Sequence, residues 1–318
     1  MEERLISRIA ELYYIYDINQ YEIARKFNFS KAKVCRIIKE AKEKGVIQFS
    51  ITDYNKRQRE LEKQLEDKYG LKEVIIYFNM EDKDYDDDAN FIFQEIGKLA
   101  ASYFNRILEN NINIALAWGK TLYNFIENIQ IEKKFKNINI FSTLGGVSLT
   151  TVEFQNNNLI QILSNKIGGA CYPIYLPLVL ESKEHKEFLT ANNNINKILG
   201  NISDIDYYFA SLGFIAESSR MYKLGVFDKS FLKELSDKKA CGEIGLNFYD
   251  IDGNFIKTSI DERAVYLGIE YIKKMKNKII IAFGKSKVLS TKGFLKTKIA
   301  DILITDSLTA LELLKSQE

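Results

Sequence analysis

Histidine and cysteine are scarce in this chain of 318 residues, and this scarcity limits the chemistry it can perform. It has one histidine, His185, and three cysteines, Cys35, Cys171 and Cys241, which stand far apart with no Cys-x-x-Cys spacing. A structural zinc site needs four closely arranged nitrogen or sulfur ligands, so the spacing predicts no metal site. One histidine in a polar run leaves little from which to build Ser-His-Asp or Cys-His catalysis. We therefore expect no catalytic residue, no cofactor and no enzyme activity.

Long apolar runs are also missing. No run approaches the ~20 residues of a membrane span, and the N-terminus lacks the basic start and apolar run of a signal peptide. The 45 basic and 43 acidic residues leave a net charge of +2, and 46% of the residues are hydrophobic. These values are ordinary for a soluble globular protein. We expect a cytoplasmic protein with no membrane partner, long enough for two domains.

Residues 18–51 carry the pattern of a helix-turn-helix. Asn19 is a good N-cap for a short helix over 20–27, and Ser30 is a good N-cap for a second helix over 31–44. Two short helices joined by a tight turn are typical of this DNA-binding motif.

The flanking segments fit the same motif. Residues 3–16 carry an i, i+3, i+4, i+7 apolar stripe, which predicts the first helix of a three-helix bundle. Gly45 ends the last helix, and residues 46–51 alternate like a strand, as the wing of a winged helix would. Cys35 lies in the last helix near its apolar face, where we expect a small buried side chain rather than a reactive thiol.

The outward face of the second helix of the motif is strongly basic. Its six basic residues against two acidic ones, Glu40 and Glu43, leave a net charge of +4 where a major groove would be met. The alternative is a solvated basic helix in a small bundle, but cap, turn, basic face and wing agree within one segment. The predicted DNA-binding residues are Ser30, Lys31, Lys33, Arg36 and Lys39.

Residues 54–70 predict a charged linker helix that ends at Gly70. Leu61, Leu65 and Tyr69 form a narrow apolar stripe along one side. The stripe could pair with its own copy in a dimer, or the helix could be a solvated spacer. The predicted domains are thus a DNA-binding domain over 1–53, this linker helix over 54–70, and an effector-sensing and oligomerisation domain over 71–318.

The rest of the chain alternates apolar strands with helices, which predicts a mostly parallel sheet covered on both faces. The predicted strands lie at 74–78, 113–118, 138–142, 170–176, 207–211, 279–283 and 302–305. The predicted helices lie at 90–110, 121–129, 158–167, 186–200, 263–274, 292–298 and 307–315. The acidic stretch 81–88 lacks the glycine and final glutamate of an EF-hand, so we expect a solvated loop.

Several of these strands end in glycine beside a polar or basic residue. Gly119, Lys120 and Thr121 follow the strand over 113–118, so the next helix offers backbone N–H groups, a lysine and a hydroxyl to an anion. The spacing is not that of a Walker loop, so nucleoside triphosphate hydrolysis is unsupported. Arg263 and Lys287 are the side chains expected on a second anionic group. The predicted effector-binding residues are Gly119, Lys120, Thr121, Gly145, Gly146, Gly213, Asp250, Arg263 and Lys287.

Taken together, these motifs resemble the SorC/DeoR-type sugar-responsive transcriptional regulators. The matching segments are Leu12-Tyr13-Tyr14, 20–25, 30–45, 65–71, 118–122, 145–147, 242–245 with Asp250, Arg263, 284–287 and 304–306. The resemblance implies a sensor domain similar to sugar-phosphate isomerases, a phosphorylated sugar as effector, and a dimer or tetramer that binds double-stranded operator DNA as repressor or activator. Some relatives hold the sugar through a lysine near the paired glycines; here Leu144 precedes them, which disfavours a covalent bond.

Two other interpretations stay open. On the related isomerase fold, Glu243, Asp250 or Glu262 could act as the base of a sugar-phosphate isomerase or lactonase. The DNA-binding half and the shortage of histidine argue against that activity. A third interpretation is a DNA-binding protein whose α/β body only oligomerises.

Overall fold

A computed structural model describes residues 2–47, 56–78, 90–132, 134–147, 154–191 and 204–315 of the chain. The chain divides into two compact units, Met1–Asn55 and Lys56–Glu318, and each is described by itself. Most of the predicted wing, the acidic stretch 81–88 and the second half of the helix predicted over 186–200 lie outside the described residues.

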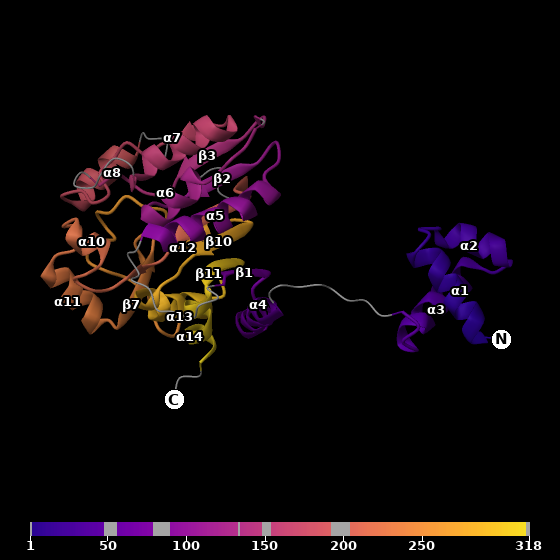
Figure 1. Cartoon of the computed structure of the whole chain (residues 1–318). Helices are drawn as coiled ribbons and strands as arrows, with labels where there is room; N and C mark the ends of the chain where they lie inside the picture. Colours follow the sequence, from indigo (N-terminus) through magenta and orange to yellow (C-terminus); the bar gives the residue numbers. More distant parts are fainter. Residues whose placement is uncertain are drawn as a thin grey trace. The chain divides into compact units, whose positions relative to one another are not determined.

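The first unit is a bundle of the helices α1 (Glu2–Tyr14), α2 (Gln20–Phe27) and α3 (Lys31–Glu43) (Figure 1). The Asn19 carboxamide oxygen accepts the N–H groups of Tyr21 and Glu22 at 3.1 and 3.0 Å, so the predicted cap of α2 is confirmed. The Ser30 hydroxyl accepts the Lys33 N–H at 3.2 Å and caps α3. The apolar sides of the three helices meet in one core, which contains Ile6, Ile9, Ile23, Val34, Ile38 and Ala41.

The second unit is built on a seven-stranded sheet whose strand order is β1-β11-β10-β5-β2-β3-β4. Every pair within it is parallel, which confirms the predicted α/β architecture. The strands are β1 (Glu73–Tyr77), β2 (Asn113–Leu116), β3 (Asn139–Ser142), β4 (Ala170–Tyr172), β5 (Tyr207–Ser211), β10 (Asn277–Ile281) and β11 (Ile302–Asp306). The helices before, between and after these strands along the chain include α4 (Lys56–Tyr69), α5 (Asn90–Ile107), α6 (Lys120–Glu127), α7 (Asn156–Ile167), α8 (Lys183–Thr190), α13 (Val288–Lys296) and α14 (Ser307–Leu314).

The helix α4 lies beside β1 at the edge of the sheet (Figure 1). Leu61, Leu65 and Tyr69 are buried in the core of this same unit. The apolar stripe of the predicted linker helix is therefore used within the chain, so α4 is not a solvated spacer and its stripe is not left to pair with a second copy.

A second, antiparallel sheet was not predicted from the sequence. It consists of β6 (Gly213–Phe214), β7 (Ala240–Ile244), β8 (Asn247–Asp250) and β9 (Phe255–Ile256). Two further helices, α10 (Arg220–Lys223) and α11 (Lys229–Asp237), connect β6 to β7.

The helix predicted over 263–274 is wrong over most of its length. Only α12 (Ile269–Ile272) is helical, after Gly268 at its N-cap. Upstream, Ala264 and Tyr266 form isolated antiparallel bridges to Val179 and Leu144. These bridges keep the backbone from Ala264 to Tyr266 out of a helix. The apolar residues there contact two other segments and do not form one face of a helix.

Candidate functional site: a basic cavity at the strand ends

A cavity of about 580 Å³ opens where β2, β5 and β10 end. These three strands are neighbours in the sheet, so the loops that follow them meet at one edge. The cavity is lined by Ala117 to Thr121 after β2, by Ser211 to Phe214 after β5, and by Phe283, Ser286 and Lys287 after β10. The structure thus brings together Gly119, Lys120, Thr121, Gly213 and Lys287 of the predicted effector set.

The loop after β2 delivers the start of α6 to this cavity. Gly119 has a φ of 114°, a conformation that other residues rarely adopt, so the glycine permits the turn into the helix. The N–H groups of a first helical turn have no partner within the helix and attract anions. The Lys120 ammonium lies 3.9 Å from the centroid of the Phe93 ring, which also lines the cavity. The loop predicted to bind an anion thus places Gly119, Lys120, Thr121 and the start of α6 on the cavity.

Arg220 is a cavity residue that the sequence analysis missed. It begins α10, and the Ser219 hydroxyl accepts the Tyr222 N–H at 3.4 Å to cap this short helix. The Arg220 guanidinium lies 4.3 Å from the centroid of the Phe154 ring. The Phe154 carbonyl in turn accepts the Gly119 N–H at 3.3 Å, so the two basic loops of the cavity share one neighbour. The sequence signal for this residue was a serine N-cap, Ser219, followed directly by an arginine at the start of a helix.

Glu243 is a buried acid in the same cavity. Its side chain is only 7% exposed, and its Oε2 accepts the Leu246 N–H at 2.9 Å. Burial raises the pKa of the Glu243 carboxyl, while the Leu246 N–H and the charge of Lys287 oppose that rise. A side chain on Gly213 would place its Cβ 2.0 Å from Glu243 Oε1, so the glycine makes room for the carboxyl.

The paired glycines do not line the cavity. The Gly145 N–H donates to Val265 O at 2.8 Å, and a Cβ on Gly145 would lie 2.6 Å from Leu176 O. The Gly146 N–H donates to the same Leu176 carbonyl at 2.8 Å. Gly145 therefore permits a close approach of the backbone after β3 to the segment of Leu176, whereas a Cβ on Gly146 would meet its nearest atom at 3.8 Å.

Asp250 also lies outside the cavity lining and holds the turn between β8 and β9. Its Oδ1 accepts the N–H groups of Asp252 and Asn254, both at 2.9 Å. Burial raises the pKa of the Asp250 carboxyl, but the hydrogen bonds from Asn254, Asp252 and Gly253 outweigh burial and lower it. In this structure the carboxylate orders a turn.

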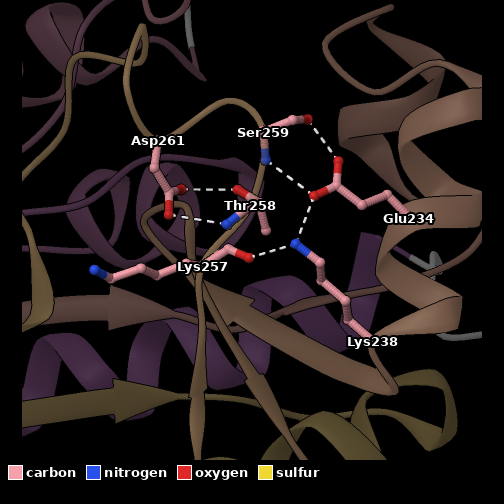
Figure 2. Close-up of polar contacts among 6 residues, drawn as sticks. All are labelled: Glu234, Lys238, Lys257, Thr258, Ser259 and Asp261. Atoms are coloured by element: carbon pink, nitrogen blue, oxygen red, sulfur yellow. Dashed lines mark hydrogen bonds and ion pairs between the residues drawn. The ribbon is translucent and has the colours of Figure 1, made fainter.

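Arg263 does not join Lys287 at the cavity. Its Nη1 lies 3.4 Å from the Leu180 carbonyl oxygen. The preceding loop is held at α11, as Figure 2 shows: Glu234 accepts the Ser259 N–H at 2.9 Å, and the Asp261 carboxylate accepts the Thr258 N–H at 3.0 Å. This network keeps the loop that leads to Arg263 fixed on α11.

The predicted DNA-binding residues share the exposed side of α3. The Lys33 ammonium lies 3.8 Å from the Phe29 ring centroid, and the Lys31 ammonium lies 4.4 Å from the Tyr21 ring centroid. Cys35 is exposed as well, so the expectation of a buried side chain is wrong. It follows the buried Val34 and falls four residues from both Lys31 and Lys39, on their side of the helix.

Within the described parts of the chain, no cluster of three or more histidine, cysteine, aspartate or glutamate side chains is placed to hold a metal ion. No helix among those residues is long and apolar enough to cross a membrane.

The chain is similar to known proteins over nearly its whole length. The sequence model of the family described as "Putative sugar-binding domain" matches residues 53–315. The deoxyribonucleoside regulator of Bacillus subtilis is 28% identical over 309 residues, which cover 97% of this chain and 96% of the relative. The sorbitol operon regulator of Klebsiella pneumoniae is 24% identical and is covered to 98%, as is this chain. The crystal structure of full-length SorC from Klebsiella pneumoniae superposes with a TM-score of 0.74 at 24% identity and covers 98% of this chain and 99% of its own.

Proposed function

The chain belongs to the SorC/DeoR-type family of sugar-binding transcriptional regulators, and we propose that a phosphorylated sugar bound in the cavity sets its affinity for operator DNA. In this proposal residues 1–53 bind DNA, 54–70 form the linker helix, and 71–318 bind the effector and assemble the chain into a dimer or tetramer. The protein acts in the cytoplasm and performs no catalysis. The observation that carries the proposal is the cavity of about 580 Å³, whose lining includes four basic residues, Lys120, Arg220, Lys223 and Lys287.

The cavity suits a small anionic ligand. Its volume lies within the ~300–1,000 Å³ typical of small-molecule sites. A phosphate group would sit at the first turn of α6, where the helix N–H groups, Lys120 and the Thr121 hydroxyl all favour it. Arg220 and Lys287 line the same cavity and supply further positive charge for the phosphate.

The sugar part of the ligand would meet a different surface. Glu243 offers a carboxylate that can accept hydrogen bonds from sugar hydroxyls. Trp118 and Phe227 provide apolar faces beside it. A ligand with a phosphate at one end and several hydroxyls at the other satisfies both parts of the cavity.

The α3 helix supplies the DNA contacts in this proposal. The charges of Lys31, Lys33, Arg36 and Lys39 lie on its exposed side, where they can reach phosphates and base edges, so the affinity should fall steeply with salt. Two copies of the chain would read two half-sites ~34–36 Å apart. Couplings between effector and DNA of this kind are typically ~1–3 kcal/mol.

Thermal unfolding of the full chain against pentose, hexose and hexitol monophosphates, with the unphosphorylated sugars as controls, tests the effector. A ligand at a hundred times its Kd stabilises the folded state by about 2.7 kcal/mol, so a single phosphorylated member should raise the midpoint clearly. Its unphosphorylated counterpart should not.

Two variants then locate the ligand. Arg220→Ala should lose most of the midpoint shift, because Arg220 lines the cavity. Arg263→Ala is the matched control and should keep the shift, since its guanidinium contacts Leu180. Loss of the shift in Arg263→Ala together with its retention in Arg220→Ala would refute the cavity as the effector site. If no member of the panel shifts the wild-type chain, the sugar-phosphate proposal itself fails.

An isomerase-like activity is the second candidate, and the buried Glu243 favours it. A carboxyl with a raised pKa at a cavity wall is the kind of group that serves as a general base. Incubation of the chain with the same sugar monophosphates, followed by NMR, measures this directly. If the chain forms product and Glu243→Gln abolishes this, the proposal of a regulator without catalytic activity is wrong. If the substrates stay unchanged, that proposal is supported.

A further inference from the structure

The open edge of the large sheet is closed by side chains of α4. Among the described strands, β1 has one neighbour, β11, and none of the others pairs with the opposite side of its backbone. The Ile76 N–H donates to Glu62 Oε1 at 3.0 Å, and the Val74 N–H donates to Glu66 Oε1 at 3.1 Å. The Gln58 side-chain nitrogen donates to the Ile76 carbonyl at 3.0 Å. These three side chains form hydrogen bonds with backbone groups of β1 that a neighbouring strand would otherwise bind.

The spacing of these contacts fixes the position of α4. Gln58, Glu62 and Glu66 are four residues apart and therefore share one helix face, while Val74 and Ile76 are two apart and share one edge of the strand. Sliding the helix by one residue would rotate all three side chains away from β1. The helix α4 is thus held to the sheet in a single register.

The far end of α4 is bound to α14. The Tyr69 hydroxyl and the Lys68 ammonium both donate to the Leu313 carbonyl oxygen at 2.9 Å. Tyr69 and Leu313 are buried, so their contact lies in the core of the unit, whereas Lys68 is exposed. These contacts connect α14 to α4.

The start of α14 is bound to the turn that forms one wall of the cavity. The short helix η3 (Lys285–Lys287) places Ser286 and Lys287 on the cavity. Immediately before η3, the Gly284 N–H donates to Asp306 Oδ2 at 3.1 Å and to the Thr309 hydroxyl at 2.9 Å. Asp306 caps α14 by accepting the Thr309 N–H at 2.9 Å, and both side chains are fully buried.

The same turn also approaches α4 directly. A groove of about 500 Å³ separate from the cavity is lined by Lys285 together with Leu61 and Gln64 of α4. Three consecutive residues of one turn therefore line the cavity on one side and the groove beside α4 on the other.

We propose that α4 is the element that passes effector occupancy from the cavity to the DNA-binding unit. The inference rests on the proposed function. A phosphate drawn to Lys287 repositions η3, and the Gly284, Asp306 and Leu313 contacts move α14 and α4 with it. The helix α4 begins at Lys56, the first residue of the second unit, so it is the helix of that unit that follows the DNA-binding unit along the chain.

The test compares two double variants of the full chain. Glu62→Ala with Glu66→Ala removes two of the contacts to β1. Glu60→Ala with Asp67→Ala is the control, because it also removes two acidic side chains from α4, and these are 58% and 66% exposed. The probes are the sugar monophosphate that gives the largest midpoint shift and a duplex selected from a random pool by the wild-type chain. The measured quantity is the ratio of duplex Kd values with and without the sugar monophosphate.

We expect this ratio in the wild-type chain to fall within the ~5–150-fold range of allosteric couplings. In Glu62→Ala with Glu66→Ala it should fall below about 2-fold, while the midpoint shift by the sugar monophosphate stays at its wild-type size. The control should keep the wild-type ratio. Glu62→Gln with Glu66→Gln should restore it, because each amide oxygen can still accept the strand N–H.

The outcomes separate the two proposals. A wild-type ratio that the alanine pair leaves unchanged, or that the control also loses, overturns the role of α4 while the regulator proposal stands. A wild-type ratio of one with every member of the panel means that the regulator proposal has failed, and this inference fails with it.

Discussion

The two helices α3 and α4 have nearly the same length and both read as charged helices with a narrow apolar stripe, yet the structure uses their charges in opposite ways. In α3 the ion pairs are local, such as Lys44 with Glu40 at 2.7 Å, and the basic side chains remain on the surface. In α4 the acidic side chains Glu62 and Glu66 accept backbone N–H groups of β1.

This difference shows that charge content alone does not tell a DNA-contacting helix from a structural one. What separates them is the kind of partner: Lys31 and Lys33 of α3 lie over aromatic rings, whereas Glu62 and Glu66 of α4 accept backbone N–H groups. The α3 face presents cations that a DNA backbone could neutralise, whereas the inner face of α4 is already occupied by a strand edge.

The largest effect should come from breaking a charge pair that the fold has buried. Lys278 and Asp301 lie 2.7 Å apart with side chains 11% and 15% exposed. Burial raises the pKa of the Asp301 carboxyl, but hydrogen bonds from the Lys278 side chain and N–H outweigh burial and hold that pKa below its ordinary value. Lys278→Met should therefore cost about 3 kcal/mol, the low end of the range for a broken buried pair, because the Lys72 ammonium remains 3.0 Å from Asp301 Oδ1.

Lys44→Met, which breaks the α3 pair, is the matched control and should change stability by less than ~0.5 kcal/mol. Urea unfolding measures both, with the fluorescence of the single tryptophan, Trp118, reporting the second unit and circular dichroism reporting the whole chain. Equal losses in the two variants would mean that burial does not distinguish these pairs.

The second-largest effect should be on the affinity for DNA. Arg36→Ala should weaken binding of a selected duplex by roughly 10- to 100-fold, the loss of one base-reading arginine, and leave the midpoint shift by a sugar monophosphate intact. Lys56→Ala removes an equally exposed cation from α4 and should change the duplex affinity by less than about 3-fold. Fluorescence anisotropy at fixed salt measures both. Similar losses in the two variants, or loss of the sugar response in Arg36→Ala, would contradict a separate DNA site on α3.

Much of the fold could be predicted because its signals are local. The caps Asn19 and Ser30 act within their own helices, and all seven strands of the parallel sheet read as apolar runs because both faces of that sheet are covered. The small antiparallel sheet was missed because β6 and β9 have two residues each, too few to show an alternation. The error over 263–274 has a different origin, since Ala264 and Tyr266 pair with segments distant in the sequence.

The candidate site was predictable where chain order determines geometry. Lys120, Gly213 and Lys287 follow neighbouring parallel strands, so their convergence at one edge comes from the topology. Chain order could not show that Arg220, rather than the predicted Arg263, lines the cavity. Arg220 begins α10 and Arg263 lies in a turn, and their placement depends on contacts made by other residues, such as Phe154 with Gly119 and Glu234 with Ser259.

The smallest expected effect is a pH dependence of stability that arises from Glu62 of α4. Burial raises the pKa of the Glu62 carboxyl, as do the charges of Glu66 and Glu73, while hydrogen bonds from Gln58 and the Ile76 N–H oppose the rise. The folded chain therefore binds this proton more tightly than the unfolded chain, so stability is lost as pH rises from the ordinary value of 4.5 through the folded pKa. Glu62→Gln removes the titration and keeps an acceptor oxygen.

The difference in unfolding midpoint between Glu62→Gln and the wild-type chain should grow in favour of the variant as pH rises from 4.5 toward neutrality. Glu60→Gln removes one negative charge from the exposed face of the same helix and corrects for charge alone. Trp118 fluorescence across the pH series follows the unit that contains α4. A difference that shrinks with rising pH would mean that the strand N–H groups hold Glu62 mainly as a carboxylate, and that its contact with β1 strengthens rather than weakens on ionisation.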